Sequence, residues 1–257
     1  MLFCGLTYQK DKHLAIIEIA GWGKGLKKRA ELLGEFLELC CEIRAAGEIR
    51  VVVLKGTSVH AFSLGEYLIS GIVQARKDGE IKLSSPAESI ANLNQPVIAA
   101  INGDAVGSGL EFALACDIRV AADTAHFGFP HIKEGLIPWD GGTQRLSRVV
   151  GQAKAMEIIL TGELIDAEEA YRMGLVNNVV PHDAVMATAM NMAREMASKG
   201  PIALRYAKEA IRNGMDLTLD QGLRLEADLY FLLHTTKDRT EGIRAFQEKR
   251  KPEFEGK

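Results

Sequence analysis

The chain has 257 residues, of which 47% are hydrophobic and 25% are charged, and its formal net charge at pH 7 is -3. This composition is typical of a globular protein with a sizeable core, built as one large domain or as a large domain with a smaller appendage. The slight negative charge excludes the basic surface that nucleic-acid binding requires. No apolar run approaches the roughly 18 residues of a membrane span, and the N-terminus resembles neither a secretory signal nor a transit peptide. We therefore expect a cytoplasmic protein with neither a nucleic-acid nor a membrane partner.

Alternating strand and helix patterns fill the first half of the chain. Apolar runs at residues 13–21 and 49–56 predict strands, and the helical pattern of residues 26–47 connects them. A crossover helix between two strands implies parallel pairing. The same order recurs in a helical region before Asn94, a strand at residues 96–102, a helix from about Gly109 and a strand at residues 118–123. The pattern predicts an α/β core with at least two crossover units.

The part of the chain after Gly151 is mostly helical. The helical patterns lie at residues 152–162, 166–174, 183–200, 201–214 and 218–235, and a short strand is expected at residues 175–181. Residues 230–233 offer more apolar surface than one helix can bury, so we expect subunit packing to cover it. We divide the chain into an α/β core at residues 1–195 and a C-terminal helical region at residues 196–257.

The stretch NGDAVGSGLEF at residues 102–112 places three glycines and Ser108 at the start of a predicted helix. Glycines let a ligand approach the backbone closely, and the N–H groups and positive dipole end of the helix point at the same space. This arrangement suits an anion or a developing oxyanion, and Glu111 in the first turn could act as a general base beside it. The alternative is that the glycines only permit tight packing and that Glu111 is an acidic residue favoured by the helix dipole.

A second loop, TSVHAFSLGEYL at residues 57–68, follows the predicted strand at residues 49–56. Ligands bind where parallel strands end, and Gly65 would let the N–H of Glu66 approach the same ligand from the other side. Two N–H donors from two loops would form an oxyanion hole. The alternative is a plain strand-to-helix connection.

Several common site motifs are absent. In GSGLEF, Phe112 occupies the position at which dinucleotide binding requires a small residue, and the sequence contains no P-loop. AFSLG departs from a serine nucleophile elbow because Ala61 replaces its first glycine. The four cysteines include no CxxC pair, so we expect reduced thiols, and His126 and His131 lack a third ligand for a metal. We expect no metal site. The cysteines are Cys4, Cys40, Cys41 and Cys116.

Three segments resemble the enoyl-CoA hydratase/isomerase (crotonase) superfamily, and the resemblance covers nearly the whole chain. They are residues 95–151, which include the glycine turn and FGFPHIKEGLIPWDGGTQRL, residues 155–181, and EGIRAFQEKRKPEF at residues 241–254. The resemblance implies a crotonase-like ββα spiral core with a C-terminal helical oligomerisation region. It also implies a homotrimer or a hexamer built as a dimer of trimers.

The resemblance implies roles for individual residues of both loops. The backbone N–H groups of Glu66 and Ser108 would hold a thioester carbonyl and stabilise the enolate. Glu111 matches the first of two glutamates that hydratases of this family use around one water, so it would activate the nucleophile. The other residues expected around the bound thioester are Leu64, Gly65, Tyr67 and Gly107.

His131 stands where the family carries its second glutamate. With an ordinary pKa of about 6.5, a histidine could supply the α-proton after water adds. The alternative is that His131 only shapes the pocket or bonds to the backbone.

Acidic and aromatic residues lie near His131 in the sequence. Asp140 belongs to a loop that lines the acyl pocket in the family and is a candidate catalytic residue, and Glu134 is a further nearby acid. Alternatively, Asp140 caps the N-terminus of the following helix. Trp139 would form an aromatic wall with Phe127 and Phe129, although core packing explains the two phenylalanines equally well.

Basic residues are expected on the coenzyme A side. Where relatives carry a CoA-contacting NRPxxxNAL segment, this chain reads AGWGKGLKKRA. Lys24, Lys27 and Lys28 would meet CoA phosphates or form a solvated helix face. Phe246 and Lys249 match family positions that close over the CoA of a neighbouring subunit.

The residues and the resemblance together predict an enoyl-CoA hydratase, which adds water across the α,β double bond of an acyl-CoA thioester. Coenzyme A is part of the substrate, and no cofactor is expected. The missing second glutamate leaves open a double-bond isomerase, or a hydratase of a cyclic dienoyl-CoA in anaerobic aromatic degradation. An alternative of another class is a catalytically degenerate CoA-binding or scaffold relative. The intact glycine turn and an exposed carboxylate at Glu111 favour the enzyme.

Overall fold

The computed structural model describes residues 2–3, 6–19, 26–56, 62, 73–75, 81–83 and 85–257, with backbone only at 2–3, 26–31, 73–75 and 81–83. A seven-stranded sheet runs through this part of the chain in the order β1-β2-β3-β4-β7-β9-β12. Its strands are β1 (Leu2–Phe3), β2 (Leu6–Asp11), β3 (Leu14–Ile19), β4 (Val51–Gly56), β7 (Val97–Ile101), β9 (Ile118–Ala122) and β12 (Asn178–Val180).

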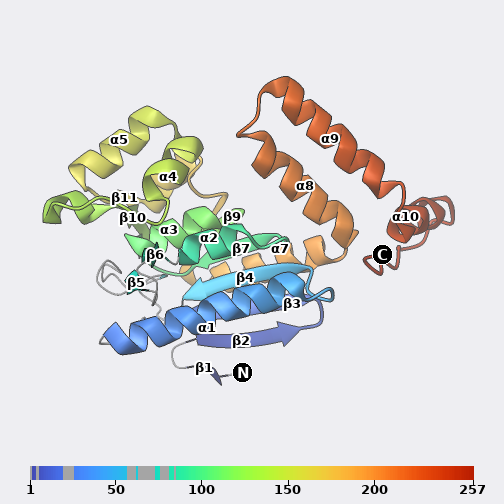
Figure 1. The fold of residues 1–257 in the computed structure, drawn as a ribbon, viewed down its shortest axis with the longest axis horizontal. Helices are drawn as coiled ribbons and strands as arrows, with labels where there is room; N and C mark the ends of the chain where they lie inside the picture. Colours follow the sequence, from blue (N-terminus) through green and yellow to red (C-terminus); the bar gives the residue numbers. More distant parts are fainter. Residues whose placement is uncertain are drawn as a thin grey trace.

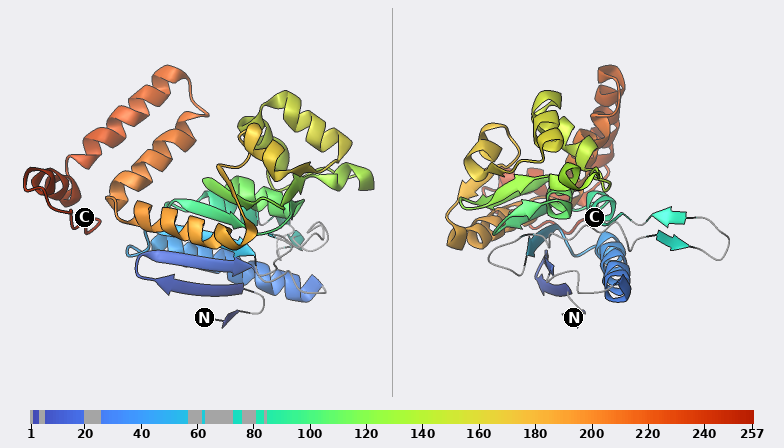
Figure 2. Two further views of the ribbon diagram at one scale, coloured as in Figure 1. Left: turned by 180° about the vertical axis from the view of Figure 1, so that it is seen from behind. Right: turned by 90° about the vertical axis from the view of Figure 1, so that its left-hand side faces the viewer.

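The strands from β3 to β12 pair in parallel, as the crossover pattern predicts, and β1 and β2 add antiparallel strands at one edge. Strand β7 is buried along its whole length, which is typical of a parallel strand covered on both faces. Helix α1 (Leu26–Ala45) lies on one face of the sheet and α7 (Val185–Ala197) on the other (Figures 1 and 2). Helix α1 faces the core with side chains at helical spacing. They are Leu32, Phe36, Leu39 and Ile43.

Two small sheets accompany the large one, and the sequence patterns did not predict them. In the first, β10 (His126–Gly128) pairs in parallel with β8 (Ala105–Val106) and antiparallel with β11 (Ile165–Asp166). The second consists of β5 (Val73–Ala75) and β6 (Ile81–Leu83). Strands of two or three residues are too short to show a period in the sequence. Strand β8 lies inside the predicted glycine turn and fixes it against β10.

Short helices connect these sheets, and the predicted helices after Gly151 are confirmed. The connecting helices are α2 (Pro86–Ala91), α3 (Ser108–Ala115), η2 (Pro130–Glu134), α4 (Gly142–Val150), α5 (Gln152–Thr161), α6 (Ala167–Arg172) and η3 (His182–Ala184). Helix α3 packs against α2, α4 and β8. All eight residues of α3 are buried, so the helix that carries Glu111 is part of the core.

The C-terminal helices α8 (Pro201–Gly214) and α9 (Leu219–Leu233) form a hairpin that projects away from the sheet, and α10 (Lys237–Gln247) follows at its end (Figure 1). Tyr230 and Phe231 on α9 are 59% and 67% exposed, so part of the apolar surface expected at residues 230–233 is exposed in the single chain. The division at residue 195 falls inside α7, which ends at Ala197. The two-part division and the oligomeric state stay predictions.

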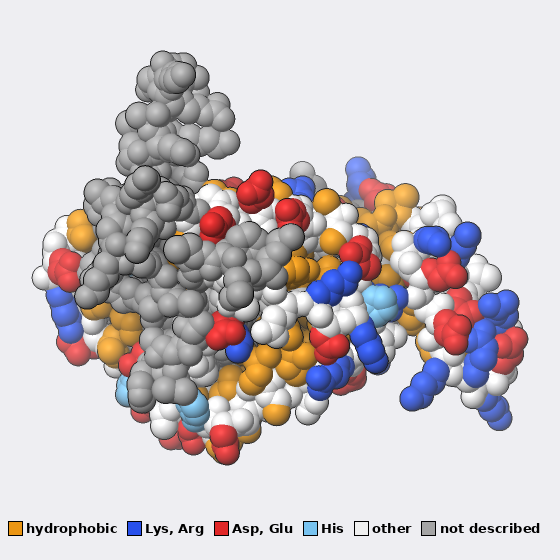
Figure 3. Space-filling model, turned by 90° about the horizontal axis from the view of Figure 1, so that it is seen from below, with side chains coloured by type: hydrophobic (Ala, Val, Ile, Leu, Met, Phe, Trp, Pro, Cys, Tyr) orange, Lys and Arg blue, Asp and Glu red, His pale blue; other side chains and the backbone are white. Residues whose placement is uncertain are grey.

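The end of the molecule that carries α10 shows interleaved acidic and basic side chains (Figure 3). In and just after α10, Glu241 forms ion pairs with Arg244 and Arg250. Among the described residues, no helix combines the length and apolar character needed to cross a membrane.

Candidate active site

The candidate site begins at the N-terminus of α3. Gly107 precedes the helix with φ of 60° and ψ of -124°, a conformation that side chains other than glycine strongly disfavour. Its N–H donates to the Gly128 oxygen at 3.0 Å, which ties the turn to β10. The first residue of α3 is Ser108, whose backbone N–H faces out of the helix end. The predicted helix start is therefore confirmed to within one residue.

Glu111 lies in the first turn of α3 and is 1% exposed, so the prediction of an exposed carboxylate is wrong. Its Oε1 accepts hydrogen bonds from the backbone N–H groups of Asp140 at 2.7 Å and Gly142 at 3.1 Å. Its Oε2 is buried and accepts no hydrogen bond from any residue that the structure describes. One oxygen is thus fixed while the other keeps its lone pairs for a ligand.

The environment of Glu111 favours the protonated form. Burial raises the pKa of Glu111 from 4.5 to about 7, and the negative charge of Asp140 acts in the same direction. The N–H groups of Gly142 and Asp140 and the positive charge of Arg145 oppose this increase. A carboxylate with a pKa near the working pH both accepts and donates protons efficiently.

The two donors to Oε1 are site residues whose backbone role the sequence patterns did not predict. Gly142 is the first residue of α4, so its N–H brings the positive end of that helix to Glu111. A Cβ at Gly142 would lie 2.6 Å from the Pro138 Cβ and 2.8 Å from the Phe129 Cζ. Only glycine fits there without a rearrangement. The glycine pair before a helix was the signal available in the sequence.

Asp140 is 4% exposed, and its side chain does not cap α4 as the alternative prediction held. The N-cap of α4 is Gly141, with no side-chain hydrogen bond. The Asp140 carboxylate instead accepts from the Ala87 N–H at 2.9 Å and from the Ser85 hydroxyl, at the start of α2. Its two oxygens are therefore both engaged away from Glu111.

His131 lies on η2 and is 2% exposed. Its ring lies beside the glycine turn, because a Cβ at Gly107 would be 3.6 Å from the His131 Cε1. Its ring centroid is 5.7 Å from that of Phe129. Burial lowers the pKa of His131, which favours the neutral imidazole. The structure thus brings His131 and Glu111 to the same turn.

The aromatic residues of the predicted wall differ in environment. Phe127 and Phe129 are fully buried, which favours core packing for both. Trp139 is half-buried and lines a cavity of about 560 Å³ together with Asp140 and Arg145. Glu134 is exposed.

Several predicted site residues lie outside the described part of the chain. They are Leu64, Gly65, Glu66 and Tyr67 of the second loop and Lys24. The side chains of Lys27 and Lys28 also lie outside it. The second oxyanion donor and the basic contacts to coenzyme A stay predictions. No group of three or more His, Cys, Asp or Glu side chains that could hold a metal occurs among the described residues.

Phe246 and Lys249 lie on and just after α10, at the far end of the molecule from α3 (Figures 1 and 2). Phe246 is 86% exposed. Their predicted contact with a neighbouring subunit's coenzyme A stays a prediction, because this chain does not bring them to its own Glu111.

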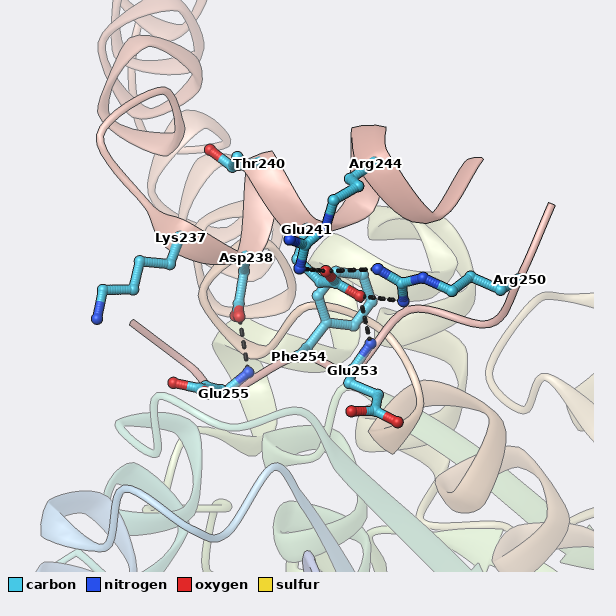
Figure 4. A pocket seen from close by; sticks show the side chains of 9 residues that line it. All are labelled: Lys237, Asp238, Thr240, Glu241, Arg244, Arg250, Glu253, Phe254 and Glu255. Atoms are coloured by element: carbon cyan, nitrogen blue, oxygen red, sulfur yellow. Dashed lines mark hydrogen bonds and ion pairs between the residues drawn. The ribbon is translucent and has the colours of Figure 1, made fainter. Parts of the chain in front are cut away.

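A cavity of about 720 Å³ lies beside α10 (Figure 4). Two of its carboxylates are already engaged: Glu241 binds Arg244 and Arg250, and Asp238 accepts from the N–H of Glu255 at 2.7 Å. This cluster anchors the C-terminal tail and is remote from the reacting groups, so we place the candidate site at α3.

Comparisons with known proteins agree with this geometry. The enoyl-CoA hydratase/isomerase family model matches residues 29–257. YngF of Bacillus subtilis (strain 168), named as an enoyl-CoA hydratase/isomerase, is 40% identical over 251 residues, or 96% of each chain. The 2,3-dehydroadipyl-CoA hydratase of Escherichia coli (strain K12) is 47% identical over 164 residues, 64% of each chain. Methylglutaconyl-CoA hydratase of Mus musculus is 46% identical over 179 residues, 68% of this chain and 57% of its own.

The structural comparison confirms the predicted crotonase-like fold. The crystal structure of an enoyl-CoA hydratase from Bacillus anthracis superposes with a TM-score of 0.86 and 37% sequence identity, covering 98% of this chain and 100% of that one. Family match, sequence identity and fold therefore agree with one another. The chain belongs to the enoyl-CoA hydratase/isomerase family.

Proposed function

We propose that this protein is an enoyl-CoA hydratase in which Glu111 carries a proton from water to the α-carbon of the substrate. This proposal rests on the hydrogen bonds of the Glu111 carboxylate. Its Oε1 accepts from two N–H groups, whereas its buried Oε2 accepts from no residue that the structure describes. The similarity to hydratases named for 2,3-dehydroadipyl-CoA and methylglutaconyl-CoA supports hydration.

The proposed reaction has two proton transfers and one C–O bond formation. Ionised Glu111 takes a proton from water, and the hydroxide adds to the β-carbon while electrons move to the thioester oxygen. The N–H of Ser108, together with that of Glu66, stabilises the resulting enolate. Glu111 then returns the proton to the α-carbon, which gives the 3-hydroxyacyl-CoA. Coenzyme A enters as part of the substrate, and these steps need no metal or redox cofactor.

One carboxylate can serve both transfers in this mechanism because its pKa of about 7 is close to the working pH. His131 replaces the second glutamate of the family. Burial favours the neutral His131 imidazole, so its proposed role is to shape the pocket and hydrogen-bond the water rather than to act as an imidazolium acid.

A second candidate function is double-bond isomerisation. The presence of His131 at the position of the family's second glutamate favours it, because moving a double bond between the α,β and β,γ positions needs one proton shuttle and no water. Hydration and isomerisation of the same thioester differ in whether solvent oxygen enters the product.

The test is turnover of straight-chain 2-enoyl-CoA, 3-enoyl-CoA and cyclic 1,5-dienoyl-CoA in H₂¹⁸O by the wild-type protein and by Glu111→Gln. We expect hydration with incorporation of ¹⁸O, and a loss of about 10² to 10⁴ in kcat for Glu111→Gln. Conversion of 3-enoyl-CoA alone, without ¹⁸O, would establish the isomerase instead. Binding of all three thioesters without turnover would overturn both and leave a CoA-binding scaffold.

We also propose that the protein assembles as a homotrimer or a dimer of trimers. The exposed apolar side chains of Leu219, Tyr230 and Phe231 on α9 and of Phe246 on α10 support it. Sedimentation analysis should give three or six copies of the 28.1 kDa chain. A monomer at micromolar concentration would contradict this proposal.

A further inference from the structure

We infer that Asp140 is a positioning residue that anchors the loop holding Glu111 to the N-terminus of helix α2. The inference rests on the proposed function, in which Glu111 is the group that moves the proton. The Asp140 side chain acts indirectly. It holds the backbone segment whose N–H groups, those of Asp140 and Gly142, donate to Glu111.

The backbone and the side chain of Asp140 face different partners. The backbone N–H donates to the Glu111 Oε1 at 2.7 Å. The carboxylate accepts from the Ala87 N–H at 2.9 Å and from the Ser85 hydroxyl. A single residue therefore links the base on α3 to a second helix, and moving its side chain would move the donor to Glu111.

The N-terminus of α2, which binds the Asp140 side chain, favours a carboxylate. Ser85 is the N-cap of α2, and Ala87 lies in the first turn, where backbone N–H groups and the helix dipole favour negative charge. Arg145 holds the same loop from the α4 side, because its Nη1 donates to the Asp140 carbonyl oxygen at 2.8 Å. The loop is thus fixed from α2 and α4, and the position of the Asp140 N–H has little freedom.

The link also brings a second negative charge close to the base. Asp140 is the strongest influence after burial among those that raise the pKa of Glu111. Among the described residues, the other charged groups that act on the pair are Arg145 from α4, which opposes this increase in pKa, and Glu88 from α2, which acts on Asp140. Burial favours the neutral form of His131 on η2. Removing the charge of Asp140 should therefore make Glu111 ionise at lower pH.

The experiment uses four single variants of the full chain: Asp140→Asn, Asp140→Ala, Ser85→Ala and, as a matched control, Glu88→Gln. Asn keeps the size and an acceptor oxygen but removes the charge, and Ala removes both. Glu88 is exposed on the same helix, and its charge acts on Asp140 but is not among the influences on the pKa of Glu111. Two quantities are measured for each variant: the pH profile of kcat/KM, and the ionisation of Glu111 by infrared difference titration against Glu111→Gln.

Asp140→Asn should shift the ionisation of Glu111 to lower pH by about one unit, in both measurements. Asp140→Ala should lower kcat about tenfold to hundredfold with little change in KM, because a misplaced base costs rate rather than binding. Ser85→Ala should lower kcat less, and Glu88→Gln should match the wild type. Partial recovery of kcat in Asp140→Asn relative to Asp140→Ala would identify anchoring as the role of the side chain.

Two results would overturn the inference: an unshifted Glu111 titration in Asp140→Asn, or wild-type kcat in Asp140→Ala. Failure of the proposed function looks different. If the wild-type protein turns over no thioester, the infrared titration still reports whether Asp140 controls the ionisation of Glu111. If Glu111→Gln is inactive while both Asp140 variants behave as wild type, the proposed function stands and this inference fails.

Discussion

Glu111 and Glu241 are hydrogen-bonded carboxylates at opposite ends of the molecule, and their surroundings differ. Among the described residues, Glu111 has N–H donors on one oxygen only and forms no ion pair. Glu241, half-buried beside the C-terminal tail, accepts from Arg244, Arg250 and the Glu253 N–H on both oxygens (Figure 4). The first carboxylate is partly satisfied and the second fully.

The two environments shift the proton affinity in opposite directions. Burial raises the pKa of Glu111 to about 7, whereas the hydrogen bonds from Arg250 lower the pKa of Glu241. A fully paired carboxylate is a structural anchor, because it stays ionised at neutral pH and takes up no proton from a ligand. A carboxylate with an open oxygen and a pKa near 7 can exchange a proton with a ligand. The volume of the neighbouring cavity does not distinguish a reacting carboxylate from a structural one, but the hydrogen-bond partners of its two oxygens do.

The largest expected effect concerns stability at high pH. The pKa of Glu111 is higher in the folded than in the unfolded chain, so protonation stabilises the fold. That stabilisation is complete below about pH 4.5 and is lost as the pH rises through about 7. Glu111→Gln should therefore gain about 3 kcal/mol of unfolding free energy relative to wild type between pH 4.5 and pH 8.5.

Urea unfolding at both pH values and one protein concentration measures this gain. Glu38→Gln, on the exposed side of α1, is the control and should show no comparable pH dependence. An equal stability difference between Glu111→Gln and wild type at pH 4.5 and pH 8.5 would show that Glu111 is not perturbed as described.

The second effect tests the donors to Glu111. Gly142→Ala places a Cβ 2.6 Å from Pro138 and 2.8 Å from Phe129, so α4 must shift. We expect a loss of about 1–3 kcal/mol of stability and a lower kcat, because the N–H of residue 142 moves away from Oε1. Gly34→Ala in α1 is the control, because its Cβ would meet nothing within 4 Å and alanine favours a helix. Wild-type activity in Gly142→Ala would show that the position of the Gly142 N–H does not matter for catalysis.

The sequence predicted those parts of the site that depend on local signals. Apolar runs and their lengths indicated β3, α1 and β4, and the glycines before residue 110 marked the start of α3 and the position of Glu111 in its first turn. These features are fixed within a few residues, so a pattern in one chain is enough to find them. The resemblance to the family added the expectation that the oxyanion hole holds a thioester carbonyl.

The sequence did not predict what holds Glu111. Its donors are 29 and 31 residues further along the chain, and only tertiary packing brings them together. The interpretation of Asp140 as an N-cap was wrong for the same reason, because Gly141 takes that position and the carboxylate reaches α2. The expected exposure of Glu111 was wrong because all eight residues of α3 are buried, with α2 and α4 packed against the helix.

A third, smaller effect is in the pH profile of kcat/KM, which shows whether Glu111 alone or Glu111 together with His131 transfers the proton. If Glu111 alone moves the proton, kcat/KM should rise tenfold per pH unit up to about pH 7 and then level off, in both hydration and dehydration. If protonated His131 were the acid, hydration would need ionised Glu111 and charged His131 together, and the profile would be a narrow bell. His131→Gln is the matched variant: it should keep the single rising limb, whereas loss of a descending limb would assign the acid to His131.

The smallest effect is expected at Glu241, and it has the opposite pH dependence. Because its arginine partners lower the folded-state pKa, Glu241 stabilises the fold above about pH 4.5, and this contribution is lost as the pH falls through the lowered pKa. Glu241→Gln should therefore lower the Tm at pH 7, and the difference from wild type should shrink in high salt and towards pH 3. Its kcat should stay within about twofold of wild type. A loss of kcat comparable to that of Glu111→Gln would mean that the α10 end takes part in the reaction, and that full pairing does not distinguish an anchor from a reacting carboxylate in this protein.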